Sequence, residues 1–337
     1  MVSVDGHIRV EPIIAGKLRR YHKLSFFQQF VRVRTILIPN IIDSVKLLVG
    51  TFQSIGKLLI WRPDVVFAKG GFVCLPVGVA AHLLKIPLVI HDSDAHPGLT
   101  SRILSRWAVT IATGAPLKYY TYPKGRTHYV GIPITSTGQP YSVSKQQAVK
   151  EALGFNRHEP LVVVTGGGLG ATSLNEAVIQ VLDDLLQFTS VALVAGKANA
   201  SVLQSSVKKR PNLQIHGYVS SEVMQQMLGA ADIVVSRAGA TTLLELASLA
   251  KPSIIVPNEQ LTGGHQLKNA AVYAQAKAAI VIQDDQLSAE PLQLVDAINA
   301  TLLNASTMKR LSANIHTFAK PNAVKDMADL IIKAIRK

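Results

Sequence analysis

Short runs of Val, Ile and Leu alternate with longer helical patterns along most of the chain, and this alternation constrains the fold most strongly. Most of the runs are continuously apolar, which is typical of strands that helices cover on both faces. Strands that alternate with helices build parallel, doubly wound α/β sheets. The ten candidate strands are 8–14, 65–68, 88–90, 109–112, 161–165, 191–195, 214–216, 233–236, 253–256 and 279–282.

The candidate strands fall into two groups, which indicates two domains. A stretch rich in Thr, Ser, Gly and Pro at 133–140, followed by a polar helical pattern, separates the fourth strand from the fifth. A chain of 337 residues has room for two domains of about 100–200 residues each. We predict two Rossmann-like halves, an N-terminal domain over 1–140 and a C-terminal domain over 141–315. A final segment, 316–337, carries a helix that could pack back on the N-terminal half.

The N-terminal half has fewer strands than the C-terminal half. It shows about four candidate strands against at least six, and it opens almost directly into a strand. A doubly wound sheet normally starts with a central strand and a glycine-rich phosphate-binding turn. We therefore expect the N-terminal domain to be truncated, without its first βαβ elements.

Basic residues are concentrated near the N-terminus. The formal net charge is +14, and residues 1–62 hold ten basic and three acidic side chains. Such an excess predicts an anionic partner: phospholipid, nucleic acid or a phosphorylated ligand. Nucleic acid is disfavoured, because aromatic residues make up only 6% and no nucleic-acid-binding module is present. Residues 36–60 mix apolar side chains with lysines, which fits either a surface that sits on an anionic membrane leaflet or an ordinary helix with its apolar face in the core.

The sequence argues against a membrane-spanning segment and against a metal centre. The most apolar stretch, 72–90, is interrupted by two prolines, a histidine and a lysine, so a turn, a helix and a buried strand explain it better. The first residues are polar and lack the apolar core of a secretory signal. A single cysteine, Cys74, excludes a disulfide scaffold, and no His, Cys or Asp cluster has metal-ligand spacing.

A first glycine-rich turn, TGGGLGA at 165–171, joins the strand at 161–165 to a helical pattern. Glycines allow backbone N–H groups to face a ligand, and the N-terminus of the following helix favours an anion. The motif has no Lys-Ser/Thr ending, so it is not a P-loop. A tight strand-to-helix turn without a ligand remains the alternative.

A second turn, SRAGATTLLE at 236–245, also follows a strand and opens a helix. The free N–H groups of its first turn, around Ala240–Thr242, would form a second anion site at the same edge of the sheet. Glu245 lies one turn further along, where a carboxylate can accept hydrogen bonds from a vicinal diol such as a ribose. An acidic side chain favoured by the helix dipole is an equally good interpretation of this position.

A third motif, GGHQLKNA at 263–270, places two amide side chains on one helix face. Gln266 and Asn269 are three residues apart. Amides offer both donors and acceptors and so suit sugar hydroxyls. Taken alone, the motif fits a solvated first turn of a helix better.

A fourth group of residues follows the strands of the N-terminal half. KGGF at 69–72 and HDSD at 91–94 both lie at carboxyl ends of strands, where open α/β sheets bind ligands. Asp92 or Asp94 could act as a base or contact an acceptor, whereas Asp94 could also be a turn or helix cap.

Together these stretches resemble the MurG glycosyltransferases, the UDP-N-acetylglucosamine–N-acetylmuramyl-(pentapeptide) pyrophosphoryl-undecaprenol N-acetylglucosamine transferases of bacteria. They occur in family order over nearly the whole chain. The matching segments are GKLRRY (16–21), RPDVVFAKGGFVCLPV (62–77), IPLVIHDSDAHPGLTSRIL (86–104), YVGIPI (129–134), VTGGGLGATSLNEAV (164–178), ADIVVSRAGATTLLELASLAKPSIIVP (231–257) and GGHQLKNA (263–270).

The resemblance implies a GT-B architecture, with two Rossmann-like domains and the site in the cleft between them. It implies inverting transfer of N-acetylglucosamine from UDP-N-acetylglucosamine to the C4 hydroxyl of lipid I, which yields lipid II for peptidoglycan. It further implies a peripheral enzyme on the cytoplasmic face of the cell membrane, with an anionic membrane surface and no nucleic acid as partner. No cofactor is obligatory, although a divalent cation can be stimulatory, and no oligomeric state is assigned. Alternatives are a GT-B enzyme with another lipid acceptor, such as diacylglycerol, and a non-catalytic nucleotide-sugar-binding protein.

The resemblance also assigns site residues by position. On the donor side, three glycines line the diphosphate, two backbone N–H groups bind the phosphates, Glu245 binds the ribose, and three polar side chains bind the sugar. The donor-side residues are Gly167, Gly168, Gly170, Asn175, Arg237, Ala240, Thr241, Glu245, His265, Gln266 and Asn269. His91 and Asp94 lie on the acceptor side.

Three departures from the family pattern affect these assignments. The family's first glycine-rich loop, which carries a candidate base histidine, has no counterpart here, so the catalytic base is unassigned and we expect little activity from this chain. Gly168 stands where the family usually has Ser, which removes a hydroxyl donor to phosphate. Asp92 stands where Glu is usual.

Overall fold

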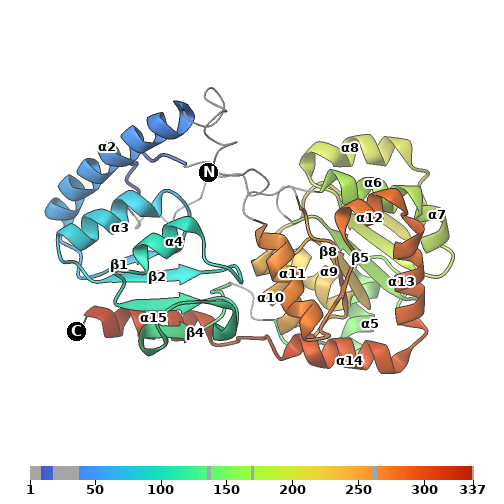
Figure 1. Cartoon of the computed structure of the whole chain (residues 1–337). Helices are drawn as coiled ribbons and strands as arrows, with labels where there is room; N and C mark the ends of the chain where they lie inside the picture. The colour runs from blue at the N-terminus through green and yellow to red at the C-terminus, as the bar shows by residue number, and fades with distance from the viewer. Residues whose placement is uncertain (1–8, 18–37, 135–137, 168–170, 260–263, 336–337) are drawn as a thin grey trace.

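The chain folds into two α/β domains, each built around a parallel sheet (Figure 1). The computed structural model describes residues 9–17, 38–134, 138–167, 171–259 and 264–335. The expected doubly wound architecture of two domains is confirmed. Within the described residues, no helix is long and apolar enough to cross a membrane.

The N-terminal domain holds a four-stranded sheet in the order β1-β2-β3-β4, and all of its pairings are parallel. Helices α2 and α3 pack against each other on one face of this sheet. The elements are α2 (Ile38–Trp61), β1 (Val66–Ala68), α3 (Cys74–Leu83), β2 (Leu88–Asp92), α4 (Leu99–Leu104), β3 (Thr110–Thr113), the 3₁₀ turns η2 (Leu117–Tyr119) and η3 (Lys124–Arg126), and β4 (Thr127–Tyr129).

The C-terminal domain holds a six-stranded parallel sheet in the order β10-β9-β8-β5-β6-β7. Every residue of β5, β6 and β8 is buried, as the continuous apolar runs predict. The elements are α5 (Val143–Ala152), β5 (Leu161–Thr165), α6 (Thr172–Gln180), α7 (Leu182–Leu185), β6 (Ser190–Val194), α8 (Lys197–Ser206), β7 (Leu213–His216), α9 (Ser221–Ala230), β8 (Ile233–Ser236), α10 (Ala240–Ser248), β9 (Ser253–Ile255), α11 (His265–Gln275), β10 (Ile280–Val281), α12 (Asp284–Ala289), α13 (Leu292–Leu302) and α14 (Ala305–His316).

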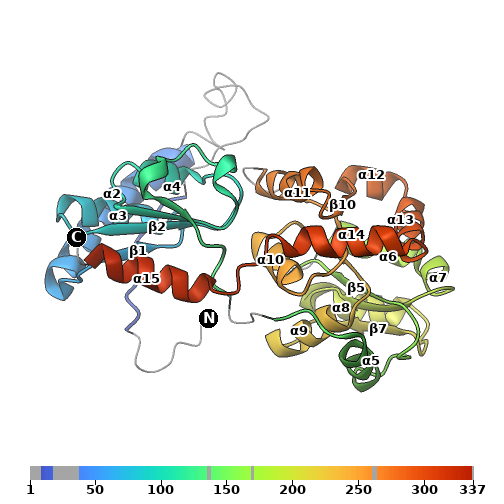
Figure 2. The same ribbon diagram turned by 90° about the horizontal axis from the view of Figure 1, so that it is seen from below.

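The last helix, α15 (Ala323–Ile335), returns from the C-terminal domain and lies along the N-terminal sheet (Figure 2). Met327 and Ala334 are buried against Val89 of β2 and Ala112 of β3. The two domains are therefore connected twice, once near residue 140 and once through the segment that leads into α15.

One strand prediction was wrong, and one strand was missed. None of residues 9–14 is in a strand, because the segment contains Arg9, Glu11 and Pro12, and a proline has no N–H to donate to a strand ladder. It runs instead beside α2, where the carbonyl oxygen of Ile14 lies 1.8 Å from where a Cβ on Gly50 would be. The sequence analysis also missed β4, because Thr127–Tyr129 is short and contains polar side chains.

Candidate functional site

A cavity in the C-terminal domain opens at the carboxyl ends of its central strands. Its volume is about 340 Å³. β5 pairs with β6 on one side and β8 on the other, so chain connections diverge here, and such a point is where open α/β sheets bind ligands. The lining residues are Gly138, Thr165, Gly167, Val194, Gly196, Gly217, Tyr218, Val219, Ser221, Met224, Gln225, Leu228, Thr241, Thr242, Glu245 and Leu249.

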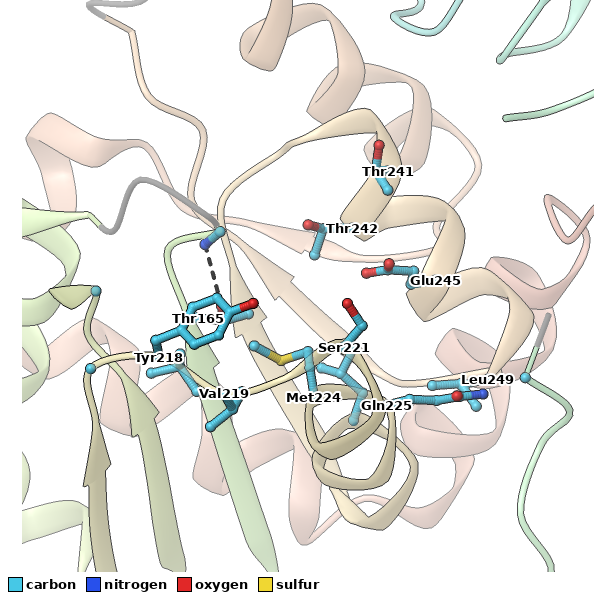
Figure 3. Close-up of a pocket in the computed structure, with 16 residues that line it drawn as sticks. Thr165, Tyr218, Val219, Ser221, Met224, Gln225, Thr241, Thr242, Glu245 and Leu249 are labelled. Atoms are coloured by element: carbon cyan, nitrogen blue, oxygen red, sulfur yellow. Dashed lines mark hydrogen bonds between the residues drawn. The ribbon is translucent and has the colours of Figure 1, made fainter. Parts of the chain in front are cut away.

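The N-terminus of α10 forms one wall of this cavity. Its N-cap, Gly239, has no side chain with which to cap the helix, so the first-turn N–H groups are available to a ligand. Thr241 and Thr242 of this turn line the cavity (Figure 3). Gly167, in the turn after β5, also lines it and has φ +77°, a conformation that glycine adopts without strain. These two turns thus border one cavity, at the position where the sequence predicts anion binding.

Glu245 directs its carboxylate into the cavity from the second turn of α10 (Figure 3). The side chain is half-buried and makes no hydrogen bond or ion pair with the residues that the structure describes. Burial raises the pKa of Glu245 above its ordinary value. A half-buried carboxylate without a protein partner is costly unless a ligand satisfies it. This supports the diol-binding interpretation over a simple helix-dipole effect.

The opposite wall comes from the β7–α9 connection, which the sequence analysis missed. Tyr218 and Val219 follow β7, and Met224 and Gln225 lie on α9, across the cavity from Glu245 (Figure 3). These residues form no recognisable motif. The sequence signal that could have found them is their place directly after a predicted strand. The loops that follow parallel strands all lie at the same edge of the sheet, where ligands bind.

Three predicted residues meet at the junction of the two domains. The Asn269 side chain is buried, and its Nδ2 donates to Asp94 Oδ1 (2.9 Å) and to the carbonyl oxygen of Ala238 (3.1 Å). Its Oδ1 accepts from the backbone N–H of Ala95 (2.8 Å). His265 Nδ1 lies 3.6 Å from Asp94 Oδ2. Asp94, predicted on the acceptor side, and the pair predicted on the sugar side are thus in direct contact.

Other predicted residues lie away from the cavity wall. Arg237 is buried and ion-paired with Asp284 (2.8 Å), so its charge is already neutralised. Asn175 is buried and donates to the carbonyl oxygen of Ala195 (2.9 Å). Gln266 accepts from the backbone N–H of Asn258 (2.8 Å). In this structure all three polar groups hold the protein together and do not face the cavity.

His91, which was predicted on the acceptor side, is a buried residue in this structure. It has no exposed surface, its Nε2 contacts the carbonyl oxygen of Gly131 at 2.8 Å, and burial lowers its pKa. The neighbouring Asp92 is buried against the Tyr122 hydroxyl, and burial raises its pKa. The placement of His91 on the acceptor side stays a prediction, and in this structure its ring is enclosed by the protein.

The remaining predicted residues are Ala240, Gly168 and Gly170. Ala240 lines a small crevice between the domains together with Ser93, Ala95 and Asn269. Gly168 and Gly170 lie outside the described residues. Across the part of the chain that the structure describes, no three His, Cys, Asp or Glu side chains are grouped so that they could hold a metal ion.

Two α/β domains, each built on a parallel sheet, with a cavity at the strand switch point of the second, have the architecture of the GT-B glycosyltransferases. The chain matches the glycosyltransferase family 28 N-terminal domain over residues 5–113 and the family 28 C-terminal domain over 161–330. It belongs to the MurG family of these glycosyltransferases.

Individual relatives agree with this family. The chain is 31% identical over 99% of its length to the UDP-N-acetylglucosamine--N-acetylmuramyl-(pentapeptide) pyrophosphoryl-undecaprenol N-acetylglucosamine transferase of Clostridium botulinum strain Hall, of which it covers 87%. The Clostridium kluyveri protein of the same name is 31% identical over 98% of this chain and 85% of its own. Crystalline Acinetobacter baumannii MurG superposes with TM-score 0.69 and 27% identity, over 86% of this chain and 79% of that one.

Proposed function

We propose that the protein transfers N-acetylglucosamine from UDP-N-acetylglucosamine to the C4 hydroxyl of lipid I and so forms lipid II for peptidoglycan synthesis. The names of its relatives supply the donor and the acceptor. The observation that carries the proposal is the carboxylate of Glu245, which has no partner among the described residues and faces a cavity bordered by the N-terminus of α10.

The cavity offers a separate environment to each part of a uridine diphosphate. Tyr218, Val219 and Met224 supply an apolar wall suited to a flat base. Glu245 accepts hydrogen bonds from the ribose diol. The diphosphate lies at the first turn of α10 and at Gly167, where N–H groups and the helix dipole favour negative charge. The sugar then extends past Ala240 toward the crevice between the domains.

Transfer is expected to need no divalent cation. The departing UDP gains negative charge, and the N-terminus of α10 is already aimed at it, so the helix can provide the stabilisation that a metal would otherwise give. We expect EDTA to change the rate by less than about twofold. Initial rates with EDTA, and then with excess Mg²⁺, check this. A rate that EDTA abolishes and Mg²⁺ restores would refute it.

The acceptor is expected to approach from a membrane surface that α2 contacts. This helix buries Gly50, Ser54 and Leu58, and its Leu47 and Ile55 pack against the core, but its other large apolar side chains are exposed. The exposed ones are Ile38, Ile41, Ile42, Val45, Leu48, Val49, Phe52, Leu59, Ile60 and Trp61. An apolar face on the outside, not in the core, supports the membrane interpretation over an ordinary packed helix. We place the enzyme peripherally on the cytoplasmic leaflet, where anionic lipids attract its basic N-terminal region.

Calorimetric titration with UDP-N-acetylglucosamine, UDP-glucose and UDP tests the donor, and turnover with lipid I or diacylglycerol tests the acceptor. Selective binding of UDP-N-acetylglucosamine and transfer to lipid I would support the proposal. Transfer to diacylglycerol but not to lipid I would show that diacylglycerol, and not lipid I, is the acceptor. Donor binding without any transfer would favour a binding protein, and no binding by the folded protein would refute the donor site.

A further inference from the structure

We infer that Asp94 and His265 form the pair that removes the proton from the acceptor hydroxyl. This inference rests on the proposed function, because it assigns a base to that reaction. The two residues come from different domains: Asp94 follows β2, and His265 is the first residue of α11. In Figure 1, α11 lies on the side of the C-terminal domain that faces the N-terminal domain.

The two ring nitrogens of His265 lie in different surroundings. Nδ1 is buried, has no hydrogen-bond partner among the described residues, and lies 3.6 Å from Asp94 Oδ2. Nε2 is not buried without a partner in the way that Nδ1 is, and 32% of the side-chain surface is exposed. The arrangement is that of an imidazole whose Nδ1–H faces an orienting carboxylate while Nε2 is free to accept a proton. A displacement of a few tenths of an ångström would complete the Nδ1–H···Oδ2 bond.

Asp94 is held in place from the other side. Its Oδ1 accepts from Asn269 Nδ2, and its carbonyl oxygen accepts from the Tyr120 hydroxyl (2.6 Å). Its side chain is 38% exposed, so the carboxylate borders solvent at the domain junction. These contacts leave Oδ2 as the carboxylate oxygen directed at His265. Asp94 therefore acts as a positioning residue, and His265 is the base.

The pair lies beside the expected path of the donor sugar. Asn269 bonds both to Asp94 and to the carbonyl oxygen of Ala238, two residues before α10 begins. Asn269 and Ala240 also line the same interdomain crevice. A diphosphate bound at the α10 N-terminus would thus place the anomeric carbon close to this crevice. An acceptor that enters from the N-terminal domain would meet the sugar there.

In the proposed step one bond forms at the anomeric carbon and one bond breaks there. The acceptor oxygen attacks the anomeric carbon from the face opposite the diphosphate, and its proton moves to His265 Nε2. The new O–C1 bond forms while the bond between C1 and the phosphate oxygen breaks. UDP leaves with that electron pair, and Asp94 stabilises the imidazolium that results. Neutral His265 is restored when the proton passes to water.

Neighbouring acid–base groups fit this role less well. His91 has no exposed surface, and Asp92 is buried against Tyr122. Glu245 lines the cavity of the C-terminal domain and not the crevice that Ala240 lines. Of the five acid–base groups compared here, Asp94 and His265 are the two that are both partly exposed and directed at a group on the other domain.

His265→Gln is the decisive variant. We expect kcat to fall about 10²- to 10⁴-fold, while the KM for UDP-N-acetylglucosamine and the affinity for UDP stay within about threefold of wild type. Asp94→Asn, which can still accept from Asn269, should lower kcat about 10- to 10³-fold. Because the residues act as a unit, the double variant should be no slower than His265→Gln. His158→Gln, an exposed histidine in the loop before β5, is the matched control.

Each other outcome overturns the inference. A His265→Gln variant with near-wild-type kcat would show that His265 is not the base. A variant that instead loses affinity for the donor would show that His265 binds the sugar. Additive effects in the double variant would leave Asp94 a purely structural role. A wild-type protein that binds UDP-N-acetylglucosamine and lipid I without turnover would show that the pair does not serve as a base. A wild-type protein that does not bind UDP-N-acetylglucosamine would overturn the proposed function, and this inference with it.

Discussion

Glu245→Ala is expected to weaken the binding of UDP and UDP-N-acetylglucosamine about 10- to 100-fold. The carboxylate has no protein partner among the described residues, so the hydrogen bonds that it loses are those to the ligand. Hydrogen bonds to a charged group contribute about 1.5–3 kcal/mol, which corresponds to this loss in affinity. Titration calorimetry at neutral pH measures the change.

The stability of the Glu245→Ala variant separates a binding role from a structural one. Burial raises the pKa of Glu245, so the folded protein holds this proton more tightly than the unfolded chain does. The ionised side chain therefore opposes folding above the raised pKa, and the penalty disappears as the pH falls through it. At neutral pH, Glu245→Ala and Glu245→Gln should unfold no more easily than wild type. Unchanged affinity for UDP, or a clear loss of stability, would remove Glu245 from the site.

The same pKa shift predicts a pH dependence of nucleotide binding. The ribose diol is bound by the ionised carboxylate, and acid protonates it. Because burial raises the pKa of Glu245, the affinity should begin to fall at a higher pH than an ordinary Glu would cause.

Sequence patterns predicted most strands of the two sheets, because the burial of a strand on both faces is reflected in the composition of that segment alone. Continuous apolar runs such as Leu161–Thr165 are buried on both faces in the structure, as their composition requires. Residues 9–14, RVEPII, contain two charged side chains and a proline, and they pack beside α2 without pairing. Pro12 has no N–H to donate to a neighbouring strand, so this segment lacks the continuous apolar pattern that predicted the buried strands correctly.

Residues that line the cavity were predicted where they belong to local strand–turn–helix patterns, and polar contacts were missed where the partner comes from a distant part of the chain. Gly167, Thr241 and Glu245 follow from strand–turn–helix patterns, and all three line the cavity. Arg237 lies in one of those patterns, yet its charge is taken up by Asp284 from a distant part of the chain. No spacing rule reveals such a pairing.

Leu48→Glu combined with Phe52→Glu is expected to release the protein from anionic vesicles. The two side chains are one helical turn apart on the outer face of α2 and are 61% and 72% exposed. Each should lose about 1.5 kcal/mol or more of apolar burial in the bilayer, so vesicle affinity should fall at least about 100-fold. The new carboxylates also repel anionic headgroups. Co-sedimentation with phosphatidylglycerol-containing vesicles measures the bound fraction.

Equally exposed leucine and valine side chains elsewhere provide the matched control. Leu303 is 80% exposed after α13, and Val202 is 66% exposed on α8. Both lie on the C-terminal domain, so Leu303→Glu with Val202→Glu makes the same change in charge and also removes two exposed apolar side chains, without touching α2. If membrane contact depends on α2, the control binds vesicles like wild type, while UDP binding stays intact in both double variants. Equal loss of vesicle binding in both would show that net charge alone holds the protein to the bilayer. Unchanged binding of the α2 variant would remove this helix from the membrane surface.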